Sequence, residues 1–287
     1  MDDLLLRWYD ANARDLPWRS AGASPWAVLV SEVMLQQTPV ARVLPAYLAW
    51  TARWPTPAAL AASPAGEAVR AWDRLGYPRR ALRLHECARV LVAEHAGAVP
   101  SDVDALLALP GVGAYTARAV AAFAYGQRVP VVDTNVRRVV ARAVAGAAEP
   151  GPPSTARDLA AVSALLPDVD APRFSVALME LGALVCTARS PRCPVCPLRS
   201  VCAWRGAGCP PYEGPARRAQ SFAGTDRQVR GLLMAVLRAS SDPVPAARLD
   251  AVWPDPVQRA RALDGLVADG LVDPVAEGMY ALPGVRG

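Results

Sequence analysis

The sequence predicts an all-α fold through residue 202, followed by a small C-terminal domain of helices and one hairpin. Apolar residues recur at helical spacing along nearly all of the first part, which indicates amphipathic helices packed on a core. Prolines stand at helix starts or in short loops, where they are tolerated. Only residues 129–132, with sequence VPVV, look extended in this part of the chain.

The expected helices follow one another with short connections. The turn Leu16-Pro17-Trp18-Arg19 separates the first helix from the second, and Pro25 suits the first position of the second. In order, we expect helices over 4–13, 26–37, 40–53, 57–62, 64–75, 79–94, 102–108, 113–125, 134–145, 155–166 and 173–185.

The C-terminal part begins after a linker. Residues 205–225 contain glycines, prolines and arginines without periodicity. Beyond them we expect helices over 226–237, 246–253 and 256–269, then a hairpin of strands 270–273 and 279–282 turned at Glu277-Gly278. Three helices and a hairpin resemble a winged helix. Such domains contact DNA or serve only for packing and pairing, and the sequence leaves both roles open.

Composition favours a partner of negative charge without proving one. The net charge is +5, the pI is near 9.1, and the chain contains no lysine, so its strongly basic side chains are all arginine. No apolar run approaches the ~18 residues that a membrane span needs. The acidic N-terminus MDDLLLRWYD has neither the basic start nor the cleavage site of a signal peptide. We therefore expect a cytoplasmic protein.

The most informative stretch is 109–135. It opens with Pro110-Gly111-Val112-Gly113, whose glycines leave the N–H groups of a helix start bare to bind phosphate. The run 129–132 then delivers Asp133 to the start of the next helix. On position alone, helix capping explains Asp133 as well as catalysis does. A phosphate-binding turn followed by a delivered carboxylate indicates chemistry on nucleic acid.

A group of cysteines predicts a metal centre. Cys186, Cys193, Cys196 and Cys202 have the spacing C-x6-C-x2-C-x5-C, which lets four thiolates surround one site. Disulfides fit poorly with a cytoplasmic chain. The spacing favours an iron–sulfur cluster over zinc, whose commoner pattern is a pair of C-x2-C clips, and it also leaves open zinc and the absence of any metal.

Several motifs resemble those of the MutY family, the adenine DNA glycosylases of the helix-hairpin-helix DNA glycosylase superfamily. The hairpin LPGVG, the acid twenty residues after its second glycine and the cysteine spacing are features of the superfamily. The motifs similar to the adenine branch are Leu16-Pro17-Trp18-Arg19, Ser31-Glu32-Val33-Met34-Leu35-Gln36-Gln37-Thr38, Leu75-Gly76-Tyr77 and Met179-Glu180-Leu181-Gly182-Ala183. The resemblance covers residues 1 to about 205, and its motifs occur in order.

The resemblance implies a fold, a cofactor and a partner. The fold is a six-helix barrel over 25–133, beside a helical domain of 1–24 and 134–204 that carries a 4Fe–4S cluster on the four cysteines. The linker 205–225 and the winged-helix-like domain 226–287 follow. The partner is double-stranded DNA containing a mispaired adenine, bound by a monomer through Gly111, Val112 and Gly113. We expect no membrane association, and association with the nucleoid only through DNA.

The implied chemistry is hydrolytic removal of a flipped-out adenine. Glu32 has apolar neighbours three and four positions away on its helix, so burial would keep it protonated as the general acid for a ring nitrogen of adenine. Asp133 would stabilise or attack the sugar cation, and the helix start would favour its ionised form. Asn135 would order the sugar or a water molecule.

Tyr115 distinguishes two branches of the superfamily. Glycosylases that resemble endonuclease III carry a lysine at this place in the hairpin, which forms a Schiff base and leads to strand cleavage. This chain has tyrosine there and no lysine elsewhere, so we expect a monofunctional glycosylase. Tyr115 would hydrogen-bond near Asp133, with packing after the turn as the alternative.

The resemblance also implies substrate contacts. The residues that would line the adenine pocket are Trp18, Arg19 and Glu180. Those that would touch the opposite base or wedge beside it are Gln37, Thr38, Leu75 and Tyr77. Core packing is the alternative, above all for Leu75 and Trp18. We expect His85 and His95 to be ordinary helix residues.

The sequence departs from the family in two places. Typical members end in a larger strand-rich domain resembling Nudix hydrolases, which recognises 8-oxoguanine, and the C-terminal segment here is too short for it. Thr134 stands where glycine is usual. We expect removal of adenine opposite 8-oxoguanine or guanine. The alternatives are a glycosylase for thymine or uracil opposite guanine, which residues 31–38 disfavour, and a non-catalytic iron–sulfur DNA-binding protein, which the presence of Glu32 and Asp133 disfavours.

Overall fold

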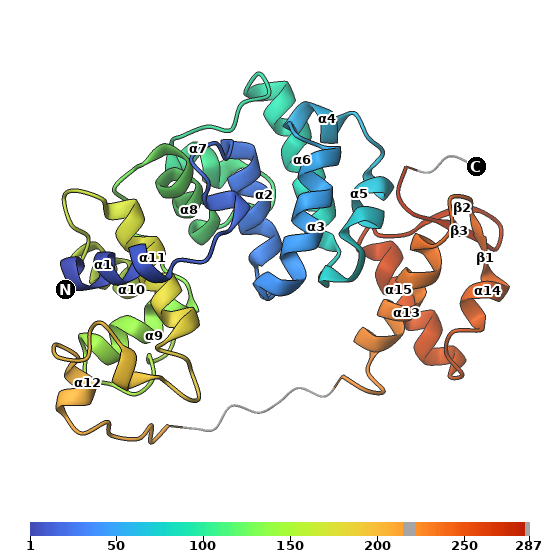
Figure 1. Cartoon of the computed structure of the whole chain (residues 1–287). Coiled ribbons are helices and arrows are strands. Elements are labelled where there is room, and N and C mark those ends of the chain that lie inside the picture. The colour runs from blue at the N-terminus through green and yellow to red at the C-terminus, as the bar shows by residue number, and fades with distance from the viewer. Residues whose placement is uncertain (215–221, 285–287) are drawn as a thin grey trace. The chain divides into compact units, whose positions relative to one another are not determined.

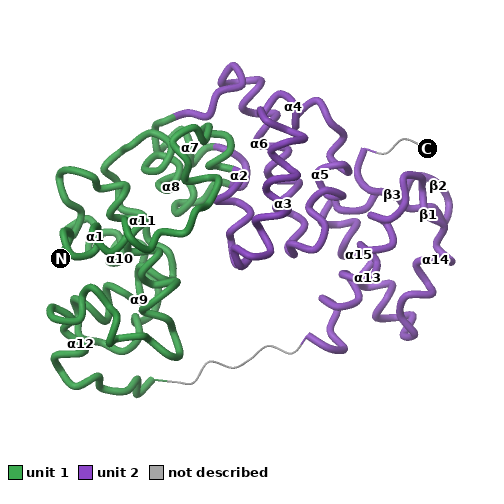
Figure 2. The backbone as a smooth tube through the Cα atoms, in the orientation of Figure 1, with its two compact units in different colours: residues 1–29, 101–108, 112–216 green, residues 30–100, 109–111, 217–287 purple. Residues whose placement is uncertain are grey.

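The structure, a computed structural model, describes residues 1–214 and 222–284 and is mostly helical, as predicted (Figure 1). The chain divides into two compact units, which are coloured separately in Figure 2. Unit 1 comprises 1–29, 101–108 and 112–216, and unit 2 comprises 30–100, 109–111 and 217–287. The chain therefore passes between the units several times, and each unit is completed by segments far apart in sequence.

Unit 1 is built from helices that bury one face each. Its main core contains Phe174, Leu178 and Leu181 of one helix against Val136 and Val139 of another, all at most 1% exposed. The helices of this unit are α1 (Asp2–Asn12), η1 (Pro17–Arg19), α7 (Val103–Ala108), α8 (Ala114–Tyr125), α9 (Thr134–Ala143), α10 (Thr155–Ser163), α11 (Ala171–Leu184), η3 (Cys193–Val195) and α12 (Ala203–Gly206).

The first part of unit 2 is also helical. Helix α2 (Pro25–Leu35) leads into it from unit 1, and the others are α3 (Val40–Arg53), α4 (Pro57–Ala61), α5 (Ala65–Trp72), η2 (Asp73–Leu75) and α6 (Arg79–Glu94). Trp50 and Trp72 lie edge to face with ring centroids 5.5 Å apart and are essentially unexposed. The bounds of α3 and α6 were predicted correctly because a proline immediately precedes each helix.

The C-terminal part of unit 2 has the element order of a winged helix. That order is α13 (Asp226–Arg238), β1 (Val244–Pro245), α14 (Ala246–Asp250), α15 (Pro256–Ala268), β2 (Asp273–Ala276) and β3 (Met279–Ala281). The strands form an antiparallel sheet in the order β1-β3-β2, with Val244 opposite Tyr280 and Asp273 opposite Ala281. Leu233 of α13 and Leu266 of α15 are at most 1% exposed and fill the core of this part.

The predicted hairpin is present, but its first strand lies three residues later than predicted. Gly270 takes a left-handed φ of +68°, and the N–H of Leu271 donates to the carbonyl oxygen of Leu266 at 3.0 Å. These residues therefore close the end of α15 instead of starting the strand. The short strand β1 was not predicted, since two residues ending in proline carry no strand pattern.

The extended run 129–132 connects α8 to α9 without strand pairing. Val131 is fully buried against Ala119 and Ala122, so packing rather than a sheet determines its path. The predicted linker 205–225 overlaps α12 at its start, and its residues 215–221 lie outside the described residues. In the described part of the chain, no helix combines the length and the apolar character needed to cross a membrane.

Candidate functional site

The predicted phosphate-binding turn connects α7 to α8. Gly111 has φ +78°, and a Cβ there would lie 2.7 Å from the Cβ of Arg83 on α6, so backbone conformation and close approach both require glycine. Val112 is buried and anchors the turn. Gly113 is exposed, has open space around it and begins α8 without a side-chain cap. Among the described residues, no side chain caps the start of α8, so its backbone N–H groups can donate to an external acceptor such as phosphate.

Asp133 caps the start of α9. Its Oδ1 accepts a hydrogen bond from the N–H of Val136 at 2.7 Å, and its Oδ2 accepts one from Nδ2 of Asn135 at 2.8 Å. Burial raises the pKa of this carboxyl and outweighs the hydrogen bonds, which lower it. The cap is present, and its hydrogen bonds favour the ionised form as predicted, but burial has the larger effect on the pKa.

A chain of hydrogen bonds leads from Asp133 to the first cysteine. Nη2 of Arg138 donates to Oδ1 of Asn135 at 2.8 Å and to the carbonyl oxygen of Gly182 at 2.6 Å. Nε of Arg138 donates to the carbonyl oxygen of Cys186 at 2.7 Å. A Cβ at Gly182 would lie only 2.6 Å from that of Asn135, so α11 approaches α9 this closely because the residue is glycine. Arg138 is buried and links α9, α11 and the cysteine segment.

Tyr115 lies in the first turn of α8. It packs against the small cluster of Ala119, Ala122 and Val131. Because Val131 precedes Asp133 by two residues, this packing helps to fix the segment that ends at Asp133. A hydrogen bond from Tyr115 near Asp133 stays a prediction.

Glu32 lies on α2 and is 5% exposed. Val28, Leu29, Val33 and Met34 of the same helix are all at most 4% exposed, so the predicted apolar setting of Glu32 is confirmed. Glu32 belongs to unit 2 and Asp133 to unit 1. The use of the two carboxyl groups on one substrate therefore stays a prediction.

Glu180, predicted for the adenine pocket, is an ion-pair centre on α11. It has no exposed surface, and it accepts hydrogen bonds from Nε and Nη2 of Arg14, both at 2.7 Å, and from Nη2 of Arg19 at 2.9 Å. Burial opposes its ionisation, but the two arginines lower its pKa to about 2. Trp18 is 7% exposed within η1. Among the described residues, Nη1 of Arg19 is buried and has no hydrogen-bond partner.

The residues predicted to face the opposite base gather around Arg80 of α6. Its guanidinium donates to Oγ1 of Thr38 at 3.0 Å, and Oγ1 of Thr38 lies 3.3 Å from the carbonyl oxygen of Leu75. It also donates, over 2.5 to 3.1 Å, to the carbonyl oxygens of Val33, Met34, Gln36 and Gly76. Burial lowers the pKa of Arg80 to about 10. Arg80 thus holds the end of α2 and the turn before α6 together.

Two of these residues have strained backbones. Gln37 has φ +53° and Tyr77 has φ +49°, backbone conformations that residues other than glycine seldom adopt. Such strain often accompanies functional positions. Tyr77 is 46% exposed, which suits a role against DNA, whereas Leu75 is 5% exposed and packs in the core.

The four predicted cysteine ligands follow α11. Sγ of Cys186 accepts a hydrogen bond from Nη1 of Arg142 at 3.5 Å. Burial raises the pKa of Cys196 to about 11, and burial together with the other cysteines nearby raises that of Cys193. Thiols in this setting ionise when cations balance their charge, which iron and the adjacent arginine provide, so the donor set fits an iron–sulfur cluster. In the described part of the chain, no three His, Cys, Asp or Glu side chains are arranged to hold a single metal ion.

Sequence reasoning missed the arginines that organise the site. They are Arg14, Arg80, Arg138 and Arg142. Arginine is spread over the whole chain, so its positions alone indicate nothing. Only the spacing of Asn135 and Arg138, three residues apart on a helix, offered a local signal.

Two segments of the chain match models of known families. Residues 30–164 match the model of the HhH-GPD superfamily of base excision DNA repair proteins, and residues 186–202 match that of the iron–sulfur binding domain of endonuclease III. The chain is 64% identical over 282 residues to an adenine DNA glycosylase of Mycolicibacterium smegmatis, covering 98% of this chain and 95% of the relative. It is 62% identical over 285 residues to one of Mycobacterium tuberculosis, covering 99% and 93%.

Solved structures with a similar fold cover most of the chain. A thermostable thymine-DNA glycosylase has a TM-score of 0.65 at 29% identity, covering 72% of this chain and 95% of that one. A trapped covalent intermediate of endonuclease III with DNA has a TM-score of 0.62 at 25% identity, covering 72% and 94%.

Proposed function

The chain belongs to the adenine DNA glycosylase family, within the HhH-GPD superfamily of base excision DNA repair proteins, and on that premise we propose that it removes adenine mispaired with 8-oxoguanine or guanine without cutting the strand. As a DNA glycosylase it hydrolyses N-glycosyl bonds, and its segment 186–202 binds a 4Fe–4S cluster. The observation that carries the proposed specificity is the buried Glu32 within the stretch 31–38, which resembles the adenine branch.

Glu32 is the proposed general acid. The adenine–sugar bond breaks more readily when a ring nitrogen of adenine takes up a proton, because the base then leaves without negative charge. A carboxyl group that is 5% exposed among apolar residues is a suitable proton donor near neutral pH. As the bond from the sugar C1′ to the base breaks, its electron pair goes to adenine.

Asp133 is the proposed anion beside the sugar cation that remains. Its oxygens are oriented by Val136 and Asn135, and Asn135 is held by Arg138. The carboxylate stabilises the oxocarbenium-like centre, or attacks it, until water completes hydrolysis. Tyr115 stands where a strand-cleaving relative would carry lysine, and with no lysine in the sequence we propose hydrolysis alone.

The proposed DNA contacts use three groups of residues. The hairpin at Gly111, Val112 and Gly113 binds phosphate through backbone N–H groups. Arg19 and Trp18 line the adenine pocket, where the buried Nη1 of Arg19 remains to bind the base and Glu180 positions Arg19. On the opposite strand, the contacts come from Gln37, Thr38 and Tyr77.

The proposed metal ligands are Cys186, Cys193, Cys196 and Cys202. The bound cluster supplies a covalent crosslink of the loop that these residues form. Arg138 and Arg142 connect this loop to α9, the helix that Asp133 caps. The ordering of the loop therefore supports the orientation of Asp133.

A second candidate is removal of thymine or uracil opposite guanine. It is favoured by the fold similarity to a thymine-DNA glycosylase. That similarity is at 29% identity, far below that to the adenine glycosylases.

A panel of duplexes tests both. Purified protein is incubated with A:8-oxoguanine, A:G, T:G and U:G duplexes, and alkali is added to half of each sample to cut abasic sites. We expect products from the two adenine duplexes only, and only after alkali. Glu32→Gln is expected to lower the single-turnover rate at least about 100-fold while duplex binding persists. Products from T:G or U:G alone would overturn the adenine proposal, and cutting without alkali would overturn the monofunctional one.

A further inference from the structure

The winged-helix-like part is bound to α5 and α6 by specific contacts within unit 2. The N–H of Gly66 donates to the carbonyl oxygen of Pro283 at 2.6 Å, and a Cβ at Gly66 would lie 2.7 Å from that oxygen. Nε of Arg238 donates to the carbonyl oxygen of Val69 at 3.2 Å, and Arg70 donates to that of Arg238. These contacts fix α13 beside α5.

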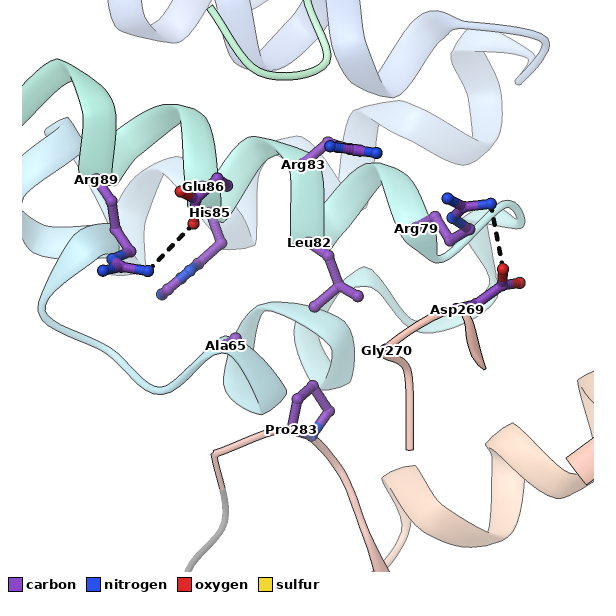
Figure 3. A pocket seen from close by; sticks show the side chains of 10 residues that line it. All are labelled: Ala65, Arg79, Leu82, Arg83, His85, Glu86, Arg89, Asp269, Gly270 and Pro283. Carbon is purple, nitrogen blue, oxygen red and sulfur yellow. Dashed lines mark hydrogen bonds and ion pairs between the residues drawn. The ribbon is translucent and has the colours of Figure 1, made fainter. Parts of the chain in front are cut away.

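The first turn of α6 is held in the same way. Arg79 forms an ion pair of 3.2 Å with Asp269 (Figure 3). Asp269 also binds Arg230 of α13. A cavity of about 360 Å³ lies beside this pair, between α6 and the residues around Pro283. The turn that carries Tyr77 therefore leads directly into a helix start that the C-terminal part holds in place.

The charge of the C-terminal part does not favour a general DNA-binding surface. Seven arginines and eight acidic residues between 226 and 287 leave a net charge of −1, so the rest of the chain carries +6. On α15, Arg259 pairs with Asp250 at 2.9 Å and Arg261 with Asp226 at 2.7 Å. Any contact with DNA must come from particular residues outside these pairs.

Arg227, in the first turn of α13, is such a residue. Its guanidinium carbon lies 5.2 Å from the ring centroid of Tyr77 and 5.9 Å from that of Phe222. Arg80 contacts the ring of Tyr77 as well, at 5.5 Å. Arg227 is exposed, and Tyr77 and Phe222 are 46% and 56% exposed. Two exposed rings contacted by one arginine form an apolar surface, and its exposure to water costs free energy.

We propose that Tyr77, Arg227 and Phe222 form a stacking platform for an unpaired nucleobase on the strand opposite the removed adenine. The inference rests on the proposed function, which places Tyr77 beside the opposite base. Aromatic rings and a guanidinium plane stack on bases of any sequence, and the arginine also attracts the phosphate backbone. The C-terminal part thereby contributes to DNA recognition through α13, with α15 engaged in its own ion pairs.

The test measures stacking directly. The probe is a duplex with 2-aminopurine at the position opposite adenine, because stacking quenches its fluorescence. Wild-type protein is expected to quench it on binding. Arg227→Ala and Phe222→Ala are expected to reduce the quenching and to weaken binding of the A:8-oxoguanine duplex about tenfold. Arg227→Lys, which keeps the cation over Tyr77, is expected to restore part of both.

The matched control is Arg248→Ala, which removes an exposed arginine from α14 of the same domain. We expect it to bind and quench like the wild type. The effects of Arg227→Ala and Tyr77→Ala should also be less than additive, because the two residues act together. The platform is overturned if Arg227→Ala matches the control, or if it lowers thermal stability while quenching is unchanged. Because quenching requires binding only, a wild type that quenches the probe yet releases no adenine from the A:8-oxoguanine and A:G duplexes would refute the proposed function and leave the platform supported.

Discussion

Asp133 shows how two opposed effects act on one carboxyl group. The helix start and Asn135 donate hydrogen bonds that favour the anion, and burial favours the protonated form. Burial prevails, so the pKa is raised even though the residue is a well-formed helix cap. The cap follows from the position of Asp133 before a helix, whereas its burial depends on segments elsewhere in unit 1.

The raised pKa predicts a pH dependence of the reaction. Asp133 must be ionised to stabilise the sugar cation, so the rate falls as the pH drops through its pKa. Asn135→Ala removes the hydrogen bond at 2.8 Å to Oδ2, which raises that pKa further. We expect the acid limb of the single-turnover rate to move to higher pH. Thr134→Ala, at an exposed neighbouring position, should leave the limb unchanged; an equal shift in both variants would contradict the role of Asn135.

The arginines of the site were not predictable at this scale. Nothing in the sequence around Arg138 and Arg142 distinguishes them from the other arginines of the chain or indicates their partners. Their roles depend on the carbonyl and sulfur atoms of the cysteine segment, more than forty residues away. A charged side chain is placed by its partners, and these were unknown before the chain was folded.

At the scale of elements, the turn between α7 and α8 was the most predictable feature. Two glycines between helical segments predicted a tight turn, and the left-handed Gly111 confirms it. The close approach of Arg83 was not predictable, because Arg83 lies more than twenty residues earlier, on α6. Sequence therefore indicated where the turn lies, and packing adds a second reason for glycine.

Gly111→Ala tests this turn. The added methyl group meets Arg83 at 2.7 Å and is strained at φ +78°, which costs about 1–3 kcal/mol of stability. We expect weaker binding of A:8-oxoguanine and of fully matched duplexes by the same factor, because phosphate contacts carry no sequence information. Filter binding and thermal unfolding measure the two effects. Gly22→Ala, with nothing within 4 Å, is the control; a loss confined to the mispaired duplex would refute phosphate binding by the turn.

Strands were predicted less well than helices. Long helices show their period and their proline starts in the sequence, as α3 and α6 illustrate. Strands of two to four residues show neither. Gly270 and Leu271, which were predicted to begin a strand, instead form the turn that ends α15. The turn at Gly278 was predictable because its φ of +67° favours glycine.

At the scale of the whole molecule, ion pairs join segments from opposite ends of a unit. Arg14 and Glu180 are 166 residues apart, and their ion pair fastens the N-terminal segment to α11. Glu180 is fully buried. A neutral residue in its place would leave the positive charges of Arg14 and Arg19 without this partner, which would be costly. The resemblance implied a substrate contact for Glu180, and the ion pairs with Arg14 and Arg19 indicate a positioning role for it.

Glu180→Gln is therefore expected to lower the free energy of unfolding by on the order of 3 kcal/mol at neutral pH. Because the folded-state pKa is about 2 and the ordinary value is 4.5, the wild-type contribution is present above pH 4.5 and is lost as the pH falls towards 2. Thermal unfolding followed by circular dichroism at several pH values measures both. Glu86→Gln, which breaks an exposed pair with Arg89, should change little. A pH-independent difference between wild type and Glu180→Gln would contradict this account.

The sequence by itself determined the all-α class, the turn at Gly111, the four cysteines, the two carboxyl groups and the absence of lysine. These features depend on residue type and local spacing, which a chain carries before it folds. Only the tertiary structure decided the raised pKa of Asp133, the partners of Glu180, the gathering of the 36–38 and 75–77 segments around Arg80, and the contact of Arg227 with Tyr77. Burial and charge pairing depend on neighbours that are distant in sequence, and folding alone brings those neighbours together.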